Sequence, residues 1–93
     1  MSAEYNNHTY RVEHHGKQSQ ARGYTFERVI LFVDDVQIPP AKGTLYEPKS
    51  FVGKPEKVRD DAIAHAEEAA KRIIDHLVAK HITIRQYLDS KGR

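Results

Sequence analysis

The residues best suited to chemistry gather in one segment, RVEHHG at positions 11–16. Glutamate and histidine are types that bind zinc or transfer protons. Neighbouring side chains of an extended strand point to opposite faces, so His14 and His15 cannot easily hold one ion together. Glu13 and His15 share a face and are the candidate metal ligands, although zinc needs three or four ligands and the rest would have to come from His8 or another strand. The pattern favours a solvated strand end over a metal site, and no cofactor is predicted.

Other kinds of catalytic site have little support in the sequence. The chain contains no cysteine, and none of its serines lies in a GxSxG elbow, so no activated nucleophile is indicated. Walker, GxGxxG and EF-hand patterns are also missing from the sequence. Asp34 and Asp35 are adjacent carboxylates, but they follow an apolar run and are expected to form a turn. We therefore expect a protein that is not an enzyme.

The charge pattern gives only weak support to nucleic-acid binding. The chain has 93 residues, with 15 Lys and Arg against 13 Asp and Glu, and a formal net charge of +2. Its basic residues are scattered among acidic ones, whereas nucleic-acid sites usually show a basic stripe or block. The weak candidates for such contacts are Arg11, Lys17, Arg22 and Arg28.

The sequence also gives an expectation about location. The first ten residues, MSAEYNNHTY, have neither a basic start nor an apolar core of the kind that a signal peptide needs. No apolar run approaches the roughly 20 residues needed to span a bilayer. We expect a soluble, cytoplasmic protein without a membrane partner.

Alternating and β-prone segments predict a sheet over residues 9–53. In TYRVEHH, residues 9–15, Tyr10, Val12 and His14 fall on one face and the intervening residues on the other. Residues 24–33, YTFERVILFV, are rich in aromatic and β-branched types and form the strongest predicted strand. A third strand is expected within 44–53, interrupted near Pro48, while residues 1–8 are expected to be flexible.

The second half of the chain changes to helical periodicity. Apolar residues from Val58 to Leu77 fall in one arc of a helix over 55–79, and Pro55 suits its first turn because proline lacks the N–H group. The tail, 82–93, contains Thr83 and Gln86 at the spacing of a capping box, which favours a short helix over about 84–90. A strand through ITIRQYL is the alternative.

Together these elements predict a single α+β domain over residues 1–93. Its architecture is a three-stranded antiparallel sheet packed by one long helix (β-β-β-α), with a short C-terminal helix or strand. This element order is similar to that of the double-stranded-RNA-binding fold and of the HicB-like antitoxins. The helix start, KPEKVRDDA, carries acidic residues where the first of these families places lysines for phosphates.

The function that the sequence favours is a non-enzymatic protein-interaction or regulatory module that acts as a homodimer. One helix can cover one face of the sheet, and the strand at 24–33 has a second apolar face that needs a cover. The weak interface candidates are Val29, Leu31, Val33, Ile84, Tyr87 and Leu88. A nucleic-acid-binding regulatory protein is the alternative, and a small histidine-based metal-binding protein is the third possibility.

Overall fold

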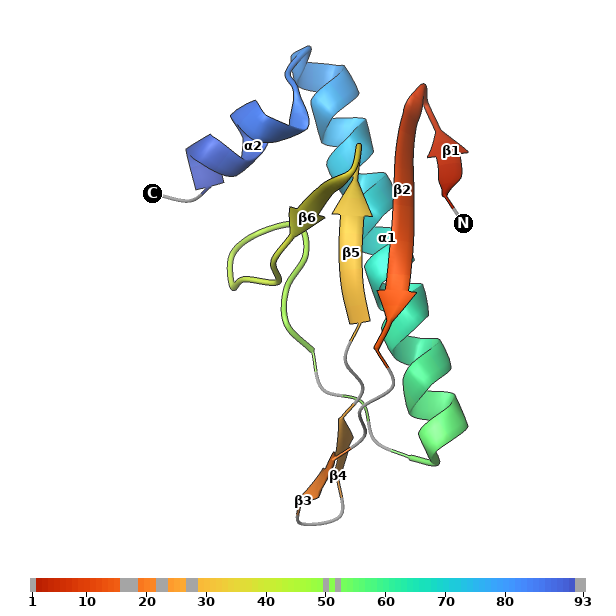
Figure 1. The fold of residues 1–93 in the computed structure, drawn as a ribbon. Helices are drawn as coiled ribbons and strands as arrows, with labels where there is room; N and C mark the ends of the chain where they lie inside the picture. The colour runs from red at the N-terminus through yellow and green to blue at the C-terminus, as the bar shows by residue number, and fades with distance from the viewer. Residues whose placement is uncertain are drawn as a thin grey trace.

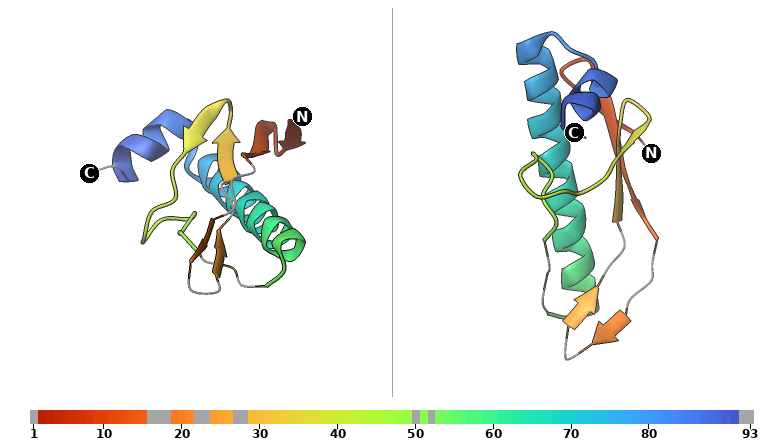
Figure 2. Two further views of the ribbon diagram at one scale, coloured as in Figure 1. Left: turned by 60° about the horizontal axis from the view of Figure 1, so that its bottom comes forward. Right: turned by 90° about the vertical axis from the view of Figure 1, so that its left-hand side faces the viewer.

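The computed structural model describes residues 2–15, 19–21, 24–26, 29–49, 51 and 53–91. An antiparallel sheet forms one layer and a long helix, α1, forms the second, which confirms the predicted α+β class (Figures 1 and 2). The sheet has the strand order β1-β2-β5-β6, and a separate hairpin is formed by β3 and β4. The strands are β1 (Ala3–Tyr5), β2 (His8–His14), β3 (Ser19–Ala21), β4 (Tyr24–Phe26), β5 (Val29–Val33) and β6 (Val36–Ile38). The helices are α1 (Pro55–Lys80) and α2 (Ile84–Lys91).

The sheet has four strands where the sequence predicts three. β1 lies within residues 1–8, which were expected to be flexible, and it pairs with β2 from Ala3–Tyr10 to Tyr5–His8. The predicted strand over 24–33 is divided into β4 and β5, with residues 27 and 28 outside the described part of the chain. The edge position next to β5 is occupied by β6.

Two tight turns explain why β1 lies next to β2 and why β6 lies next to β5. Asn6 and Asn7 have φ values of 48° and 67°, and Asp34 and Asp35 have values of 49° and 62°. Two consecutive residues with positive φ make the type I′ turn, whose twist matches that of a two-residue hairpin. Asn and Asp tolerate this backbone region better than most residues. Each pair therefore reverses the chain within two residues and fixes an antiparallel neighbour.

The prediction of a third strand over 44–53 is wrong for the described residues of that segment. The backbone N–H of Ala41 donates to the Tyr46 carbonyl oxygen at 3.0 Å, and the Thr44 hydroxyl donates to the Ala41 carbonyl oxygen at 2.7 Å. The segment thus bonds to itself, and Tyr46, which is 6% exposed, anchors it to the core. Its backbone groups find partners without joining the sheet.

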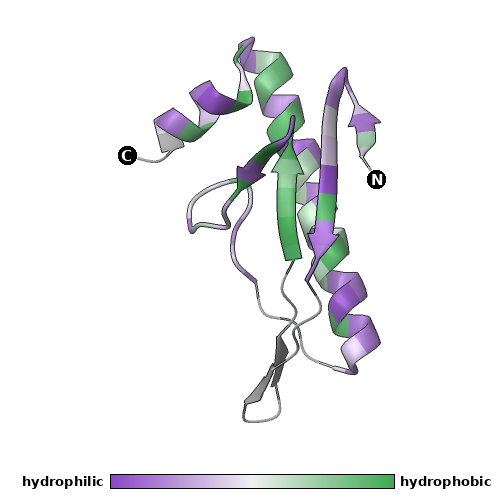
Figure 3. Cartoon of the chain, in the orientation of Figure 1, coloured by the Kyte–Doolittle hydropathy of each residue, from purple (hydrophilic) through white to green (hydrophobic). Residues whose placement is uncertain are grey.

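The core lies between α1 and one face of the sheet. β5 is hydrophobic along its length, whereas hydrophobic and hydrophilic residues alternate along β2 (Figure 3). Small side chains on α1 allow its backbone to approach the strands closely. The sheet contributes Tyr10, Leu31, Val33 and Ile38 to the core, and α1 contributes Ala66, Ala69, Ala70, Ile73, Ile74 and Leu77.

The predicted helix is confirmed as α1 over 55–80. Both of its ends have the residues and hydrogen bonds expected at helix termini. Pro55 lies in the first turn, where a missing N–H costs no intrahelical bond. At the other end His81 has a φ of 55°, and its N–H reaches the Val78 carbonyl oxygen at 3.4 Å. The N–H of Ile82 donates to the Leu77 carbonyl oxygen at 3.1 Å, which completes a Schellman motif.

The tail forms the helical alternative, α2, and the strand alternative is wrong. The capping box is present, because the Thr83 N–H donates to Gln86 Oε1 at 2.9 Å and the Gln86 N–H donates to Thr83 Oγ1 at 3.2 Å. Ile84 and Tyr87 are 4% and 2% exposed and belong to the core of this same chain. Neither α1 nor α2 is long and apolar enough to cross a membrane, and this holds for the described residues.

Candidate functional site

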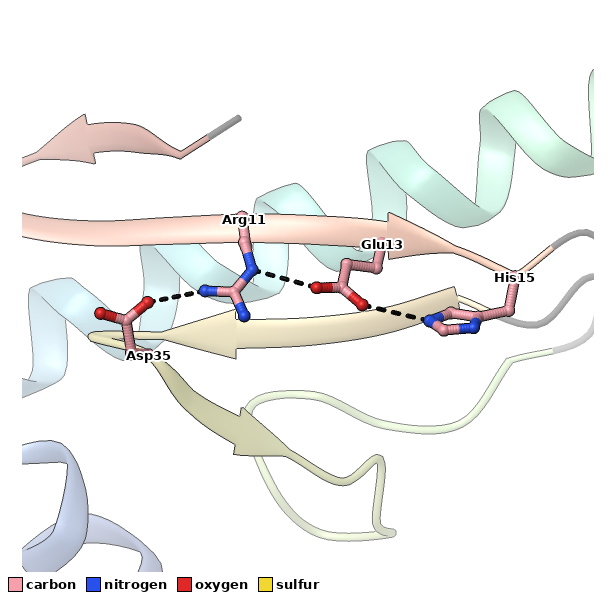
Figure 4. Close-up of polar contacts among 4 residues, drawn as sticks. All are labelled: Arg11, Glu13, His15 and Asp35. Atoms are coloured by element: carbon pink, nitrogen blue, oxygen red, sulfur yellow. Dashed lines mark hydrogen bonds and ion pairs between the residues drawn. The ribbon is translucent and has the colours of Figure 1, made fainter.

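Four ionisable side chains form a row on the face of the sheet that points away from α1 (Figure 4). Arg11 lies in its centre and donates from Nη1 to Asp35 Oδ1 at 2.6 Å and from Nε to Glu13 Oε2 at 3.2 Å. The other oxygen of Glu13, Oε1, lies 3.1 Å from His15 Nε2. We call Asp35, Arg11, Glu13 and His15 the ionisable row.

The local sequence explains why these side chains share one face. Residues 11, 13 and 15 alternate along β2 and just beyond its end, and strand geometry places alternate side chains on one side. Asp35 comes from the tight turn after β5, which lies beside the start of β2. Three members of the row therefore follow from the predicted strand pattern, and the fold brings the fourth, Asp35, beside them.

Two apolar side chains of β5 lie beside the row. Phe32 is the register partner of Arg11, and Ile30 is the register partner of Glu13. The Arg11 Cζ atom lies 4.0 Å from the centroid of the Phe32 ring, a cation–π contact. Ile30 and Phe32 are half-buried and do not belong to the hydrophobic cluster under α1. We call the row together with Ile30 and Phe32 the open face.

The contacts within the row change the ionisation of two of its members. The hydrogen bond from Arg11 lowers the pKa of Glu13, and the hydrogen bond with His15 lowers it further. The Glu13 carboxylate in turn raises the pKa of Arg11, with a smaller contribution from Asp35. The side chains of Arg11 and Glu13 are 27% and 41% exposed, so water screens both interactions. The central pair stays ionised at neutral pH.

The structure brings the candidate metal ligands Glu13 and His15 together but gives them a cation as the third neighbour. Arg11 donates to Oε2 of Glu13, and His15 contacts the other oxygen, Oε1. A guanidinium cannot ligate a metal and repels a positive ion. Among the described residues, no group of three His, Cys, Asp or Glu side chains is placed to hold a metal ion.

Of the candidate nucleic-acid contacts, only Arg11 lies in the described part of the chain. Its charge is paired with Glu13 and Asp35, and its guanidinium covers the Phe32 ring. The two carboxylates offset the guanidinium charge, which weakens the attraction of Arg11 for a phosphate. Lys17, Arg22 and Arg28 lie outside the described residues.

Four of the six candidate interface residues are buried within this chain, and the other two are partly buried. Leu31 and Val33 are fully buried under α1, and Ile84 and Tyr87 are also core residues. Val29 and Leu88 pack against the same cluster. The sequence correctly indicates that β5 has two apolar faces, but α1 covers the Leu31 face. Among the described residues, no helix covers the face of Ile30 and Phe32.

One polar contact beside the turn after β5 was missed by the sequence reasoning. His8 Nδ1 lies 2.6 Å from Asp34 Oδ2, and the Thr9 N–H donates to Asp34 Oδ1 at 3.0 Å. The sequence predicts a turn at Asp34 and Asp35, but only the pairing of β5 with β2 places that turn beside the start of β2. His8 also borders a shallow hollow of about 410 Å³, which is lined by Asn6, Asn7, His8, Leu77, Val78, His81 and Ile82.

In the described part of the chain, the fold and the open face define a small α+β domain in which one long helix covers one face of a four-stranded sheet, beside a separate two-stranded hairpin. Comparisons of the chain with protein-family models, with curated proteins and with solved structures found no match.

Proposed function

We propose that this chain is a non-enzymatic protein-interaction module that forms a homodimer through its open face. One observation carries the proposal: α1 covers a single face of the sheet (Figure 2), and strand alternation places Ile30 and Phe32 on the other. Burial of apolar side chains on a sheet face against a second surface removes them from water and lowers the free energy. The cytoplasmic location that the sequence favours stays a prediction.

The composition of the open face suits a partner that is itself a protein surface. Its centre contains an aromatic and an aliphatic side chain, and its remaining positions contain charges of both signs. Aromatic and arginine side chains are enriched where proteins meet, usually inside a polar rim. Nucleic-acid binding is less well supported, because the one described candidate, Arg11, is already neutralised by carboxylates.

The size of the open face sets the expected strength of the dimer. Four strands at about 4.8 Å spacing and the length of β2 give a footprint of roughly 19 Å by 23 Å. That is at most about 440 Å² per copy, or roughly 870 Å² for the pair, which is below the roughly 1,200 Å² of standard specific interfaces and in the range of weak, transient ones. We therefore expect a dissociation constant in the micromolar range, which a single dilute measurement would miss.

Sedimentation equilibrium over a concentration range of about 1 to 500 µM tests the proposal. The wild-type mass should rise from monomer to dimer, and Phe32→Thr, which replaces the aromatic ring by a β-branched residue of high strand propensity, should stay monomeric. The matched control is Val78→Thr, because Val78 is 44% exposed on α1 and lies outside the open face. A wild-type chain that stays monomeric throughout, or a Phe32→Thr variant that associates equally well, would overturn the proposal. A wild-type monomer that shifts RNA in a low-salt gel would favour the nucleic-acid alternative.

A further inference from the structure

The ionisable row has a symmetry that an interface between two copies could use. Along β2 its order is Asp35, Arg11, Glu13 and His15, so two carboxylates alternate with a guanidinium and an imidazole that each contact a carboxylate (Figure 4). When such a row is turned end to end and laid on itself, every group meets one of the opposite kind. The row is therefore complementary to its own reversed copy, as an isologous interface requires.

The apolar side chains follow the same arrangement. Arg11 and Phe32 form one cross-strand pair, and Glu13 and Ile30 form the next on the same face. The two pairs are separated by two residues along the strand, or roughly 7 Å. A two-fold axis that lies parallel to the sheet, crosses β2 at a right angle and passes between the pairs would exchange them.

We propose that two copies meet open face to open face about this axis, with Arg11 of each copy opposite Glu13 of the other. Phe32 of one copy then packs on Ile30 of the other, and Asp35 lies opposite His15. The two β2 strands cross antiparallel, with the sheets about 10 Å apart and rotated by about 30° as in other aligned sheet pairs. A guanidinium has five N–H donors, which is more than its two bonds within the chain take up. This arrangement rests on the proposed homodimer and specifies its geometry.

The other face-to-face arrangement is less favourable. A two-fold axis running along the strands would lay β2 of one copy on β5 of the other. Arg11 would then face Phe32, and Glu13 would face Ile30 of the second copy. A carboxylate pressed against an aliphatic side chain loses water without gaining a partner, which costs free energy. The charges of the open face therefore favour the arrangement in which β2 lies on β2.

Two single charge reversals and their mixture test the geometry. Arg11→Glu places two anions at the centre of the row, and Glu13→Arg places two cations there, so each variant alone should dimerise at least about tenfold more weakly than wild type. In an equimolar mixture the two variants are complementary at both central positions, and a heterodimer of near wild-type affinity should form. The double variant, with Arg11→Glu and Glu13→Arg together, should dimerise more tightly than either single variant, because its two central positions are again complementary to their reversed copy.

Folding is checked for each variant by circular dichroism and by its thermal midpoint. Where a central reversal unfolds the chain, the outer pair gives the same test, because the Asp35 and His15 side chains are 81% and 46% exposed. Asp35→Lys and His15→Asp should then associate better with each other than either does with itself. A wild-type chain that never dimerises removes the proposed function and this geometry together. A wild-type dimer that Phe32→Thr abolishes, but whose charge variants show no preference for the mixture, overturns this geometry alone.

Discussion

Replacing Leu31 by alanine should destabilise the fold by about 3 kcal/mol, whereas the same change at Ile30 should cost about 1 kcal/mol or less. Leu31 is fully buried and lies between its register partners Val12 and Ile38 under α1. Ile30 is half-buried on the open face of the same strand. The two neighbours therefore report which face of β5 the helix covers.

The size of the Leu31→Ala effect follows from what the change removes. Three carbon groups leave a site with no exposure to water, and each is worth about 0.8 kcal/mol of transfer free energy, or roughly 2.5 kcal/mol in all. A residual cavity raises the cost, because the helix and the strands on either side of Leu31 cannot fully close the space. For Ile30, much of the side chain already contacts water, so the loss comes mainly from strand propensity.

Urea denaturation followed by circular dichroism measures both variants against wild type. A loss of about 3 kcal/mol shifts the urea midpoint by roughly 1 to 3 M in a domain of this size. Each titration is run at a low and at a high protein concentration, because a homodimer stabilises the fold by mass action. At the high concentration the loss of stability caused by Ile30→Ala should be larger than in dilute solution. The loss caused by Leu31→Ala should be nearly the same at both concentrations. Equal losses for the two variants in dilute solution would refute the assignment of the faces.

Three further predictions concern single features of the fold. Because hydrogen bonds from Arg11 and then His15 lower the pKa of Glu13 below its ordinary 4.5, this carboxylate stabilises the folded state above about pH 4.5 and loses that effect as the pH falls further. Urea midpoints between roughly pH 3 and pH 6 should therefore fall less steeply for Glu13→Gln than for wild type. Ala70→Leu should cost about 1 to 3 kcal/mol in thermal unfolding, because Ala70 is fully buried in the core; no loss would mean unfilled space there. His81→Gly should raise stability by about 0.5 to 1 kcal/mol by relieving a φ of 55°, while His81→Ala should not.

The sequence by itself determined the elements whose patterns are local. Apolar residues at helical spacing, together with Pro55, defined the long helix, and the Thr83–Gln86 spacing defined the cap of the second helix. Alternation along β2 correctly separated His14 from Glu13 and His15. These features depend on residues within one or two turns or strand positions of each other, so the sequence shows them directly.

Strand number was harder to predict because short strands carry little pattern of their own. β1 and β6 have three residues each, too few for alternation to be recognised. Their presence depends on the Asn6–Asn7 and Asp34–Asp35 turns, which fold each of them onto a longer strand. The segment after Gly43 looked more like a strand than β6 did, yet it satisfies its backbone groups with its own carbonyl and hydroxyl oxygens.

Only the tertiary structure decided which face of β5 stays open and what gathers there. Both faces of that strand are apolar, so hydrophobicity could not choose between Leu31 and Ile30 as the residue under the helix. The choice depends on the register with β2, which places Tyr10 beside Val33 and Arg11 beside Phe32. The same register brings Asp35 to Arg11 across 24 positions of sequence. Long-range pairing of strands thus turned a local Glu–His pattern into a row of opposite charges, because only the folded sheet sets those side chains on one surface.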